Sequence, residues 1–189
     1  MVKQYKIFID QGHNPQGFNA GAEGNGLREQ DITFSVGRKL YDLLTADPRF
    51  SARLSRPTED TVLGTSNSTS LQRRVNDANS WGADYFISIH TNAAVTDTAN
   101  GTEVYVYSSG GKAFDLAGYV LAQIVKTVGT RDNGVRINPS LYVLRKTRMP
   151  AILTELAYIT NPDDAHKLEN DQDGFAKGIY DGLLEYLDL

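Results

Sequence analysis

Two of the three histidines stand where an apolar, strand-like run of residues ends. His13 follows the run 7–9 and opens a loop rich in glycine and asparagine. His90 closes the run 85–89 in the same way, and a third apolar run ends in Glu155. Open α/β sheets bind ligands beyond the carboxyl ends of their strands. Two imidazoles and a carboxylate that meet there predict a metal site, and a metal in such a crevice indicates catalysis.

The ligand types available to a metal are restricted because the chain contains no cysteine. Any metal must therefore be held by His, Asp or Glu. Two histidines and one carboxylate form a recurrent catalytic zinc set that leaves a fourth position open. Taken alone, His13 is explained as a solvated loop residue and His90 as a satisfied core residue. Their matched positions at two strand ends favour the metal site, since core packing does not require that match.

The third ligand must be a nearby acid, and Glu29 is the strongest candidate. It stands where the glycine-rich loop enters the first predicted helix, where the helix dipole alone would also favour an acid. Asp31 directly precedes the periodic apolar residues and fits the capping role better, which leaves Glu29 free to ligate. Asp10 and Glu23 are weaker candidates. Asp10 fits better as a group that orients a ligand imidazole.

Glu155 is unusual because it is an acid inside an apolar run. Burying a carboxylate is costly unless it is paired or hydrogen-bonded. A structural ion pair with Arg145 or Arg148 is one explanation. The other is a general acid/base beside a metal-activated water, and we favour it because both histidines lie at the same sheet end. His166, on a polar helix, is expected to be solvent-exposed rather than a ligand.

The elements that must position these residues follow from apolar periodicity. Strands are predicted at 7–9, 50–54, 85–89, 102–107, 141–144 and 151–156, with 11–26 as a loop. Helices are predicted over 32–44, from 71 after a cap at Thr69 or Ser70, over 117–128, from Pro162, and over 175–187. Strands that alternate with helices predict an α/β fold. We expect a single domain, 1–189, with a mostly parallel twisted sheet of about six strands flanked by helices on both faces.

Composition excludes several classes of protein. The 189 residues are 40% hydrophobic and 22% charged, as in ordinary globular domains. The formal net charge of −4 argues against nucleic acid as a partner. No apolar run is long enough for a membrane span, and the first residues do not read as a signal peptide. We expect a monomer.

The chain resembles the zinc-dependent N-acetylmuramoyl-L-alanine amidases of bacterial cell-wall hydrolysis, the amidase 3 family. The resemblance covers nearly the whole chain. It rests on six segments in order, of which the strand that ends Ser-Ile-His-Thr-Asn-Ala is the most specific. These segments are residues 9–13, 26–29, 71–79, 83–93, 143–145 and 150–155 with 159–161.

The resemblance implies a zinc ion (Zn²⁺) on His13, Glu29 and His90, with Glu155 as the catalytic carboxylate. The family cleaves the amide between the lactyl group of N-acetylmuramic acid and L-alanine of the stem peptide. Zinc would polarise the carbonyl and activate water while Glu155 passes a proton to the leaving amine. The implied partner is peptidoglycan, and the implied location is the bacterial cell wall or the cell exterior.

Some positions depart from the family pattern without removing a ligand or the acid. Asn14 replaces a usual glycine, and residues 156–158 replace a usual Gly-Phe, which bears on substrate preference. The stretch 91–101 is too short for the helical segment that occludes the zinc in some members, so we expect an open site. Three other functions fit parts of the pattern: a zinc peptidase or deacetylase, a non-catalytic wall-binding module, and a metal-free glycosidase that uses Glu29 and Glu155.

Overall fold

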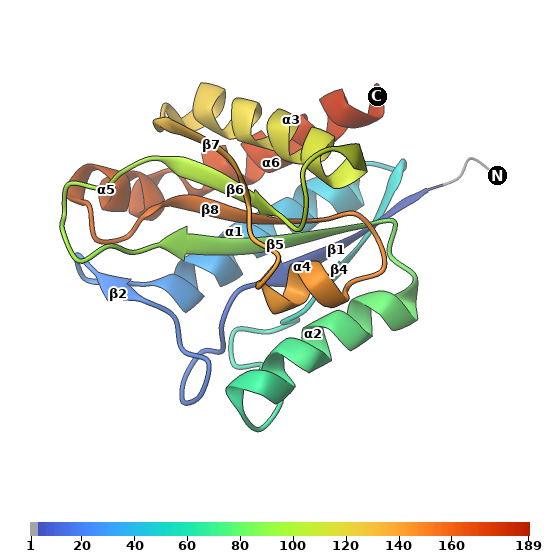
Figure 1. Ribbon diagram of the computed structural model, residues 1–189, viewed down its shortest axis with the longest axis horizontal. Coiled ribbons are helices and arrows are strands. Elements are labelled where there is room, and N and C mark those ends of the chain that lie inside the picture. Colours follow the sequence, from blue (N-terminus) through green and yellow to red (C-terminus); the bar gives the residue numbers. More distant parts are fainter. Residues whose placement is uncertain (1–3) are drawn as a thin grey trace.

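A twisted sheet of six strands lies between two layers of helices in the computed structural model, which describes residues 4–189 (Figure 1). The first three residues of the predicted domain 1–189 lie outside the described part. The strands are β1 (Tyr5–Gln11), β4 (Phe50–Leu54), β5 (Tyr85–Asn92), β6 (Thr102–Val106), β7 (Asp132–Ile137) and β8 (Ala151–Tyr158), with a separate hairpin of β2 (Glu23–Gly24) and β3 (Leu27–Arg28). The helices are α1 (Glu29–Ala46), α2 (Asn67–Trp81), α3 (Gly111–Val128), α4 (Tyr142–Lys146), α5 (Pro162–Asn170) and α6 (Gln172–Leu187).

The strand order is β4-β1-β5-β8-β6-β7, so β1, β5 and β8 are central neighbours. Four of the five pairings are parallel, and β6 runs antiparallel to β8. The predicted α/β class and mostly parallel sheet are therefore confirmed. Because β1, β5 and β8 run in the same direction, their carboxyl ends meet at one edge of the sheet.

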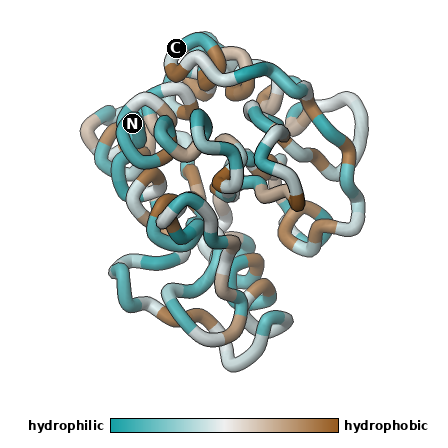
Figure 2. The backbone as a smooth tube through the Cα atoms, turned by 90° about the vertical axis from the view of Figure 1, so that its left-hand side faces the viewer, coloured by the Kyte–Doolittle hydropathy of each residue, from teal (hydrophilic) through white to brown (hydrophobic). Residues whose placement is uncertain are grey.

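The two faces of the sheet bury two apolar clusters that follow the alternation of side chains along each strand. Residues such as Ile7, Ile9 and Ile87 pack against α1, α3 and α6. Phe8 and Phe86, one residue out of phase, pack against α2 and α4 on the opposite face. Figure 2 looks onto the end of the molecule that lies at the left in Figure 1; brown segments lie mostly inside the trace, and much of its outer part is teal or white.

Several local predictions are wrong, each for an identifiable reason. Residues 142–144 lie in helix α4, with Leu141 as its N-cap, rather than in a strand, because a run of four apolar residues has no period that separates the two. The sixth strand is β7, whose polar, exposed sequence gives no strand pattern. Helix α2 begins earlier than predicted, since Ser66 is its N-cap and forms a capping box with Thr69. Within the predicted loop 11–26, residues 23–24 form the first strand of the β2–β3 hairpin.

No helix in the described range 4–189 is long and apolar enough to cross a membrane.

Candidate metal centre

His13 lies directly beyond β1, in a turn that depends on the glycine before it. The Gly12 N–H donates to the Ile89 carbonyl at 2.9 Å, which joins the turn to β5. A Cβ on Gly12 would lie 2.6 Å from Cε1 of His90 and would clash. His13 itself adopts a left-handed backbone conformation, with φ of 68°. This strained turn directs the first imidazole toward the second.

Arg74 of α2 holds the same turn in place. Its side chain is fully buried and donates to the carbonyl oxygens of Gln11 and His13. It also pairs with Asp10 at 2.7 Å, and the second Asp10 oxygen accepts from the Ser88 hydroxyl at 2.8 Å. Burial raises the pKa of Asp10, but the charge and hydrogen bond of Arg74 outweigh it and lower this pKa below its usual range. Asp10 thus orients Arg74 rather than an imidazole, contrary to our expectation.

Glu29 is the first residue of α1, and both of its carboxylate oxygens are held by backbone N–H groups. Oε2 accepts from Ala22 at 2.9 Å and Oε1 accepts from Thr91 at 3.0 Å. The chain passes so close that a Cβ on Gly21 would lie 2.7 Å from Cβ of Glu29. The carboxylate therefore has a defined position even though it follows a loop.

The three predicted ligands converge. Nε2 of His13 lies 3.0 Å from Oε1 of Glu29, and Nδ1 of His90 lies 3.1 Å from the same oxygen. The two ring nitrogens are 3.1 Å apart. Ligand atoms at 2.0–2.1 Å around a tetrahedral zinc are roughly 3.3 Å from one another. The three side chains together form a group with the spacing and donor types of a metal site.

The protonation of Glu29 suits this role. Burial raises its pKa, but hydrogen bonds from His13 and His90 and the charges of the two rings outweigh burial. The pKa of Glu29 is therefore held well below its usual range. The carboxylate is ionised at neutral pH, as a metal ligand must be.

Glu155 lies next to this group in a row across three strands. It pairs in register with His90 of β5 on one side and with Glu103 of β6 on the other. All three side chains project from the face that α2 and α4 cover, as the strand alternation requires. Side chains directly opposite on adjacent strands have Cβ atoms about 5 Å apart.

Glu155 makes no side-chain hydrogen bond or ion pair within the described part of the chain. Its Oε2 is buried and makes no hydrogen bond, and no ion pair with Arg145 or Arg148 is found among residues 4–189. Burial, followed by the charges of Glu29 and Glu103, raises the pKa of Glu155 well above its usual value. The alternative explanation of Glu155 as a structural ion pair is therefore excluded, while the acid/base role that we favoured stays a prediction.

Glu103, which sequence reasoning missed, is held in place beside Glu155 by two phenols. It accepts from the hydroxyls of Tyr105 at 2.7 Å and Tyr158 at 3.0 Å. Burial, then the hydrogen bond to Glu103, raises the pKa of Tyr158 to about 12. Both tyrosines thus stay protonated and donate to Glu103 at neutral pH.

The other acids and the third histidine are remote from the centre. Glu23 is exposed and lies 3.9 Å from Arg28. Asp31 does not cap α1, because the helix starts at Glu29 and its N-cap, Arg28, makes no side-chain cap bond. His166 is exposed on α5, as predicted.

The position of Arg74 in the sequence indicates that its side chain is buried. It lies three residues after Leu71 and four before Ala78, on the apolar face of α2. A charge on such a face indicates a buried partner. Glu103 gave no comparable signal, since its burial depends on the antiparallel pairing of β6 with β8.

Comparisons with known proteins agree with this geometry. A family described as N-acetylmuramoyl-L-alanine amidase matches residues 7–185. The chain is 38% identical over 188 residues to N-acetylmuramoyl-L-alanine amidase CwlM of Bacillus licheniformis, covering 97% of this chain and 69% of that protein. It is also 38% identical over 187 residues to N-acetylmuramoyl-L-alanine amidase LytC of Bacillus subtilis, covering 95% of this chain. It spans only 35% of the length of LytC.

Solved structures show the same fold. An N-acetylmuramoyl-L-alanine amidase from Clostridium difficile 630 superposes with a TM-score of 0.88 at 34% identity, covering 98% of both chains. The catalytic domain of the amidase CwlV from Bacillus (Paenibacillus) polymyxa gives a TM-score of 0.85 at 32% identity, covering 98% of this chain and 99% of that one.

Proposed function

The chain belongs to the N-acetylmuramoyl-L-alanine amidase family, and on this premise we propose that it hydrolyses peptidoglycan with a zinc ion held by His13, Glu29 and His90. The bond cut is the amide between N-acetylmuramic acid and L-alanine. Family membership supports the reaction, and the donor set supports the metal. Glu155 is the proton carrier of the proposed reaction.

The observation that carries the zinc proposal is the spacing of the three donor atoms, 3.0–3.1 Å. Two imidazole nitrogens and one carboxylate oxygen are common zinc donors, and three of them leave a coordination position for water or substrate. Backbone N–H groups hold the carboxylate, and Arg74 holds the turn of the first imidazole. The ligands are thus arranged before a metal binds.

In this proposal the residues of the chain have separate tasks. Zinc, when bound, supplies a Lewis acid that polarises the scissile carbonyl and lowers the pKa of water. Glu155 accepts the proton of the attacking water at a carboxylate oxygen and delivers it to the leaving amine nitrogen. An acid with a raised pKa is suited to both steps near neutral pH, since it can both take and give a proton. Glu103 and its two tyrosines line the side of Glu155 away from the histidines.

We also propose that residues 1–189 are one catalytic domain that acts as a monomer at the cell wall or outside the cell. The stretch 93–101 contains no helix. We therefore propose that substrate reaches the metal centre without the removal of an occluding segment. Activity of the isolated chain on purified peptidoglycan, with no added protein, is the expected result.

Analysis of the hydrolysis products tests the proposed reaction. Digestion of purified peptidoglycan should release new N-terminal alanine, with no new reducing sugar ends and no acetate. Reducing ends would instead indicate a glycosidase, acetate a deacetylase, and other new amino termini a peptidase. Binding to the wall without any product would indicate a binding module.

Metal analysis tests the cofactor separately. We expect about one zinc per chain, and His13→Ala and His90→Ala should each lose it. Retention of zinc by both variants would show that the metal, if present, lies elsewhere.

A further inference from the structure

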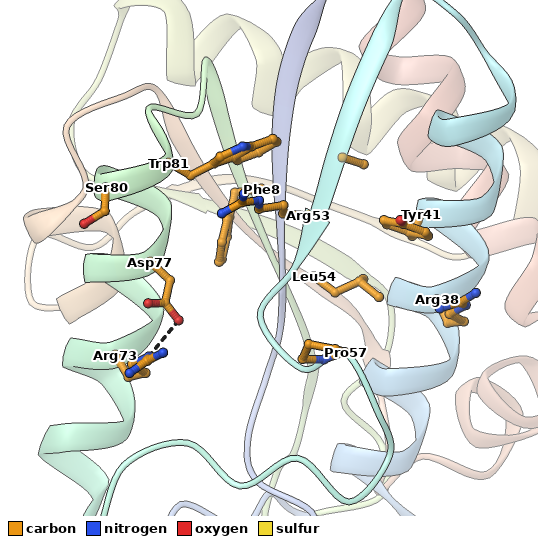
Figure 3. Close-up of a pocket in the computed structure, with 11 residues that line it drawn as sticks. Phe8, Arg38, Tyr41, Arg53, Leu54, Pro57, Arg73, Asp77, Ser80 and Trp81 are labelled. Carbon is orange, nitrogen blue, oxygen red and sulfur yellow. Dashed lines mark hydrogen bonds and ion pairs between the residues drawn. The ribbon is translucent and has the colours of Figure 1, made fainter.

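A groove lies over the outer edge of β4, away from the metal centre (Figure 3). It has a volume of about 680 Å³. Its floor is the edge strand, and its walls come from α1 on one side and α2 on the other. Eleven residues line it, among them Arg38, Arg53, Arg73 and Trp81. No part of the proposed reaction uses this groove.

The floor of the groove offers unpaired backbone groups. Within residues 4–189, β4 is the last strand on this side of the sheet and pairs only with β1. The hydrogen bonds at its two ends, from Tyr5 to the Arg49 carbonyl and from Ser55 to the Ile9 carbonyl, fix which residues face β1. Alternate residues of a parallel strand face one neighbour. The N–H and C=O groups of Ala52 and Leu54 therefore point outward, where an added strand would pair.

The two walls of the groove differ in chemistry. Ala52 and Leu54 project toward the α1 side, where they pack at the margin of the apolar core. Arg53 projects to the other side and lies over the indole of Trp81, with 4.9 Å between its guanidinium carbon and the ring centroid. No carboxylate partner of Arg53 is found within residues 4–189. The α1 side thus combines the apolar Ala52 and Leu54 with Arg38 and Tyr41, whereas the α2 side carries a cation without a carboxylate partner among residues 4–189.

The groove is basic although the chain carries a net charge of −4. Three arginines line it; Arg73 is paired with Asp77 at 2.9 Å and Arg38 with Asp42 at 3.4 Å, which leaves Arg53 as the cation without a carboxylate partner in the described residues. A ligand with carboxylates would therefore find complementary charge at Arg53, on a chain whose net charge is negative. Charged residues also protect edge strands from pairing. If Arg53 only protects β4, an acidic peptide should not bind.

We propose that this groove binds an extended, acidic segment of a partner protein, which adds a strand to the sheet beside β4. Main-chain hydrogen bonds to Ala52 and Leu54 supply affinity, and alternate side chains supply specificity. Residues opposite each other on paired strands lie about 5 Å apart. The segment should therefore carry an acidic residue opposite Arg53 and apolar residues at the flanking positions.

Trp81 provides a direct assay, because it is the only tryptophan in the chain and lines the groove. Short capped peptides that alternate valine with glutamate are titrated into the full-length chain, and valine–lysine peptides serve as the matched control. We expect a saturable change in Trp81 emission with the acidic peptide only, weakened by added salt. No saturable change below about 1 mM, or an equal change with the lysine peptide, would overturn the proposal.

Charge reversal tests the anchor. Arg53→Glu should weaken binding of the acidic peptide at least about tenfold and create binding of the lysine peptide. Lys112→Glu reverses an exposed cation in the first turn of α3, outside the groove and the metal centre, and should change neither affinity. Peptidoglycan hydrolysis should be unaffected in both variants, so this result does not depend on the proposed function. Equal effects of the two variants would show that only net charge matters.

Hydrogen exchange tests the strand pairing without a substitution. The amides of Ala52 and Leu54 should exchange fast in the free chain and become protected when the acidic peptide binds. Unchanged exchange at saturation would rule out strand addition. If Trp81 emission instead depends on protein concentration with no peptide added, the occupant is a second copy of the chain and the proposal is wrong.

Discussion

Replacing Glu155 by glutamine removes the proposed proton-carrying group and keeps the shape of the side chain. The change breaks no existing hydrogen bond, because Oε2 of Glu155 has no hydrogen-bond partner. It also removes an acid that lies beside Glu103 and near Glu29. The free energy of unfolding should therefore not fall, and zinc should remain bound, since Glu155 is not among the three convergent ligands.

Catalysis should change far more than stability. General acid–base catalysis contributes about 10²- to 10⁴-fold, which corresponds to roughly 2.7–5.4 kcal/mol at about 1.36 kcal/mol per decade. The assay is the initial rate of release of N-terminal alanine from purified peptidoglycan, with zinc content and thermal midpoint measured on the same samples. Glu169→Gln, an exposed acid on α5, is the matched control and should retain full activity.

Two outcomes of the Glu155→Gln experiment would refute the reasoning. A variant that binds zinc and keeps more than about a tenth of the wild-type rate would show that Glu155 does not carry the proton. A variant that loses its zinc would show that Glu155 supports the metal, and the drop in rate would then say nothing about proton transfer.

Four further predictions follow from the surroundings of the metal centre. Arg74→Lys cannot reach both carbonyl oxygens of the first histidine's turn, so zinc affinity should fall about 10- to 100-fold in a competition titration; unchanged affinity would refute the positioning role. Gly12→Ala should lower the free energy of unfolding in urea by about 1–3 kcal/mol, because its Cβ would clash with an imidazole. Gly118→Ala, in open space within α3, should raise the free energy of unfolding by about 0.5–1 kcal/mol. Chelation should abolish hydrolysis and added zinc should restore it, and a chelated enzyme that stays active would exclude the metal. The pKa of Glu29 is lowered in the fold, so the ionised carboxylate stabilises the metal-free fold above the usual pKa of 4.5, and this stabilisation is lost as the pH falls below that value. The difference in unfolding free energy between wild type and Glu29→Gln, measured in chelator, should therefore shrink as the pH falls from about 6 to 3.

The parts of the fold that sequence could predict are those with strong apolar periodicity. β4 matches its predicted bounds, and α1 and α6 follow their apolar repeats. β7 could not be predicted because its polar residues lie at a sheet edge and bury little surface. The convergence of His13, Glu29 and His90 could be predicted because strand ends share an edge. The burial of Arg74 could be predicted from its place on the apolar face of α2, but its bonds to the carbonyls of Gln11 and His13 could not, because residue type does not mark backbone partners.

The spread of the site along the chain has a consequence for how the protein is made. The ligands come from the ends of β1 and β5 and the start of α1, and the proposed proton carrier comes from β8, which inserts between β5 and β6. Such non-local parallel pairings form late, because long loops must close first. During synthesis from the N-terminus, a chain that already presents His13 and His90 still lacks Glu155. On the proposed mechanism the nascent hydrolase has no proton carrier, so we expect a chain broken off before β8 not to cleave the cell wall.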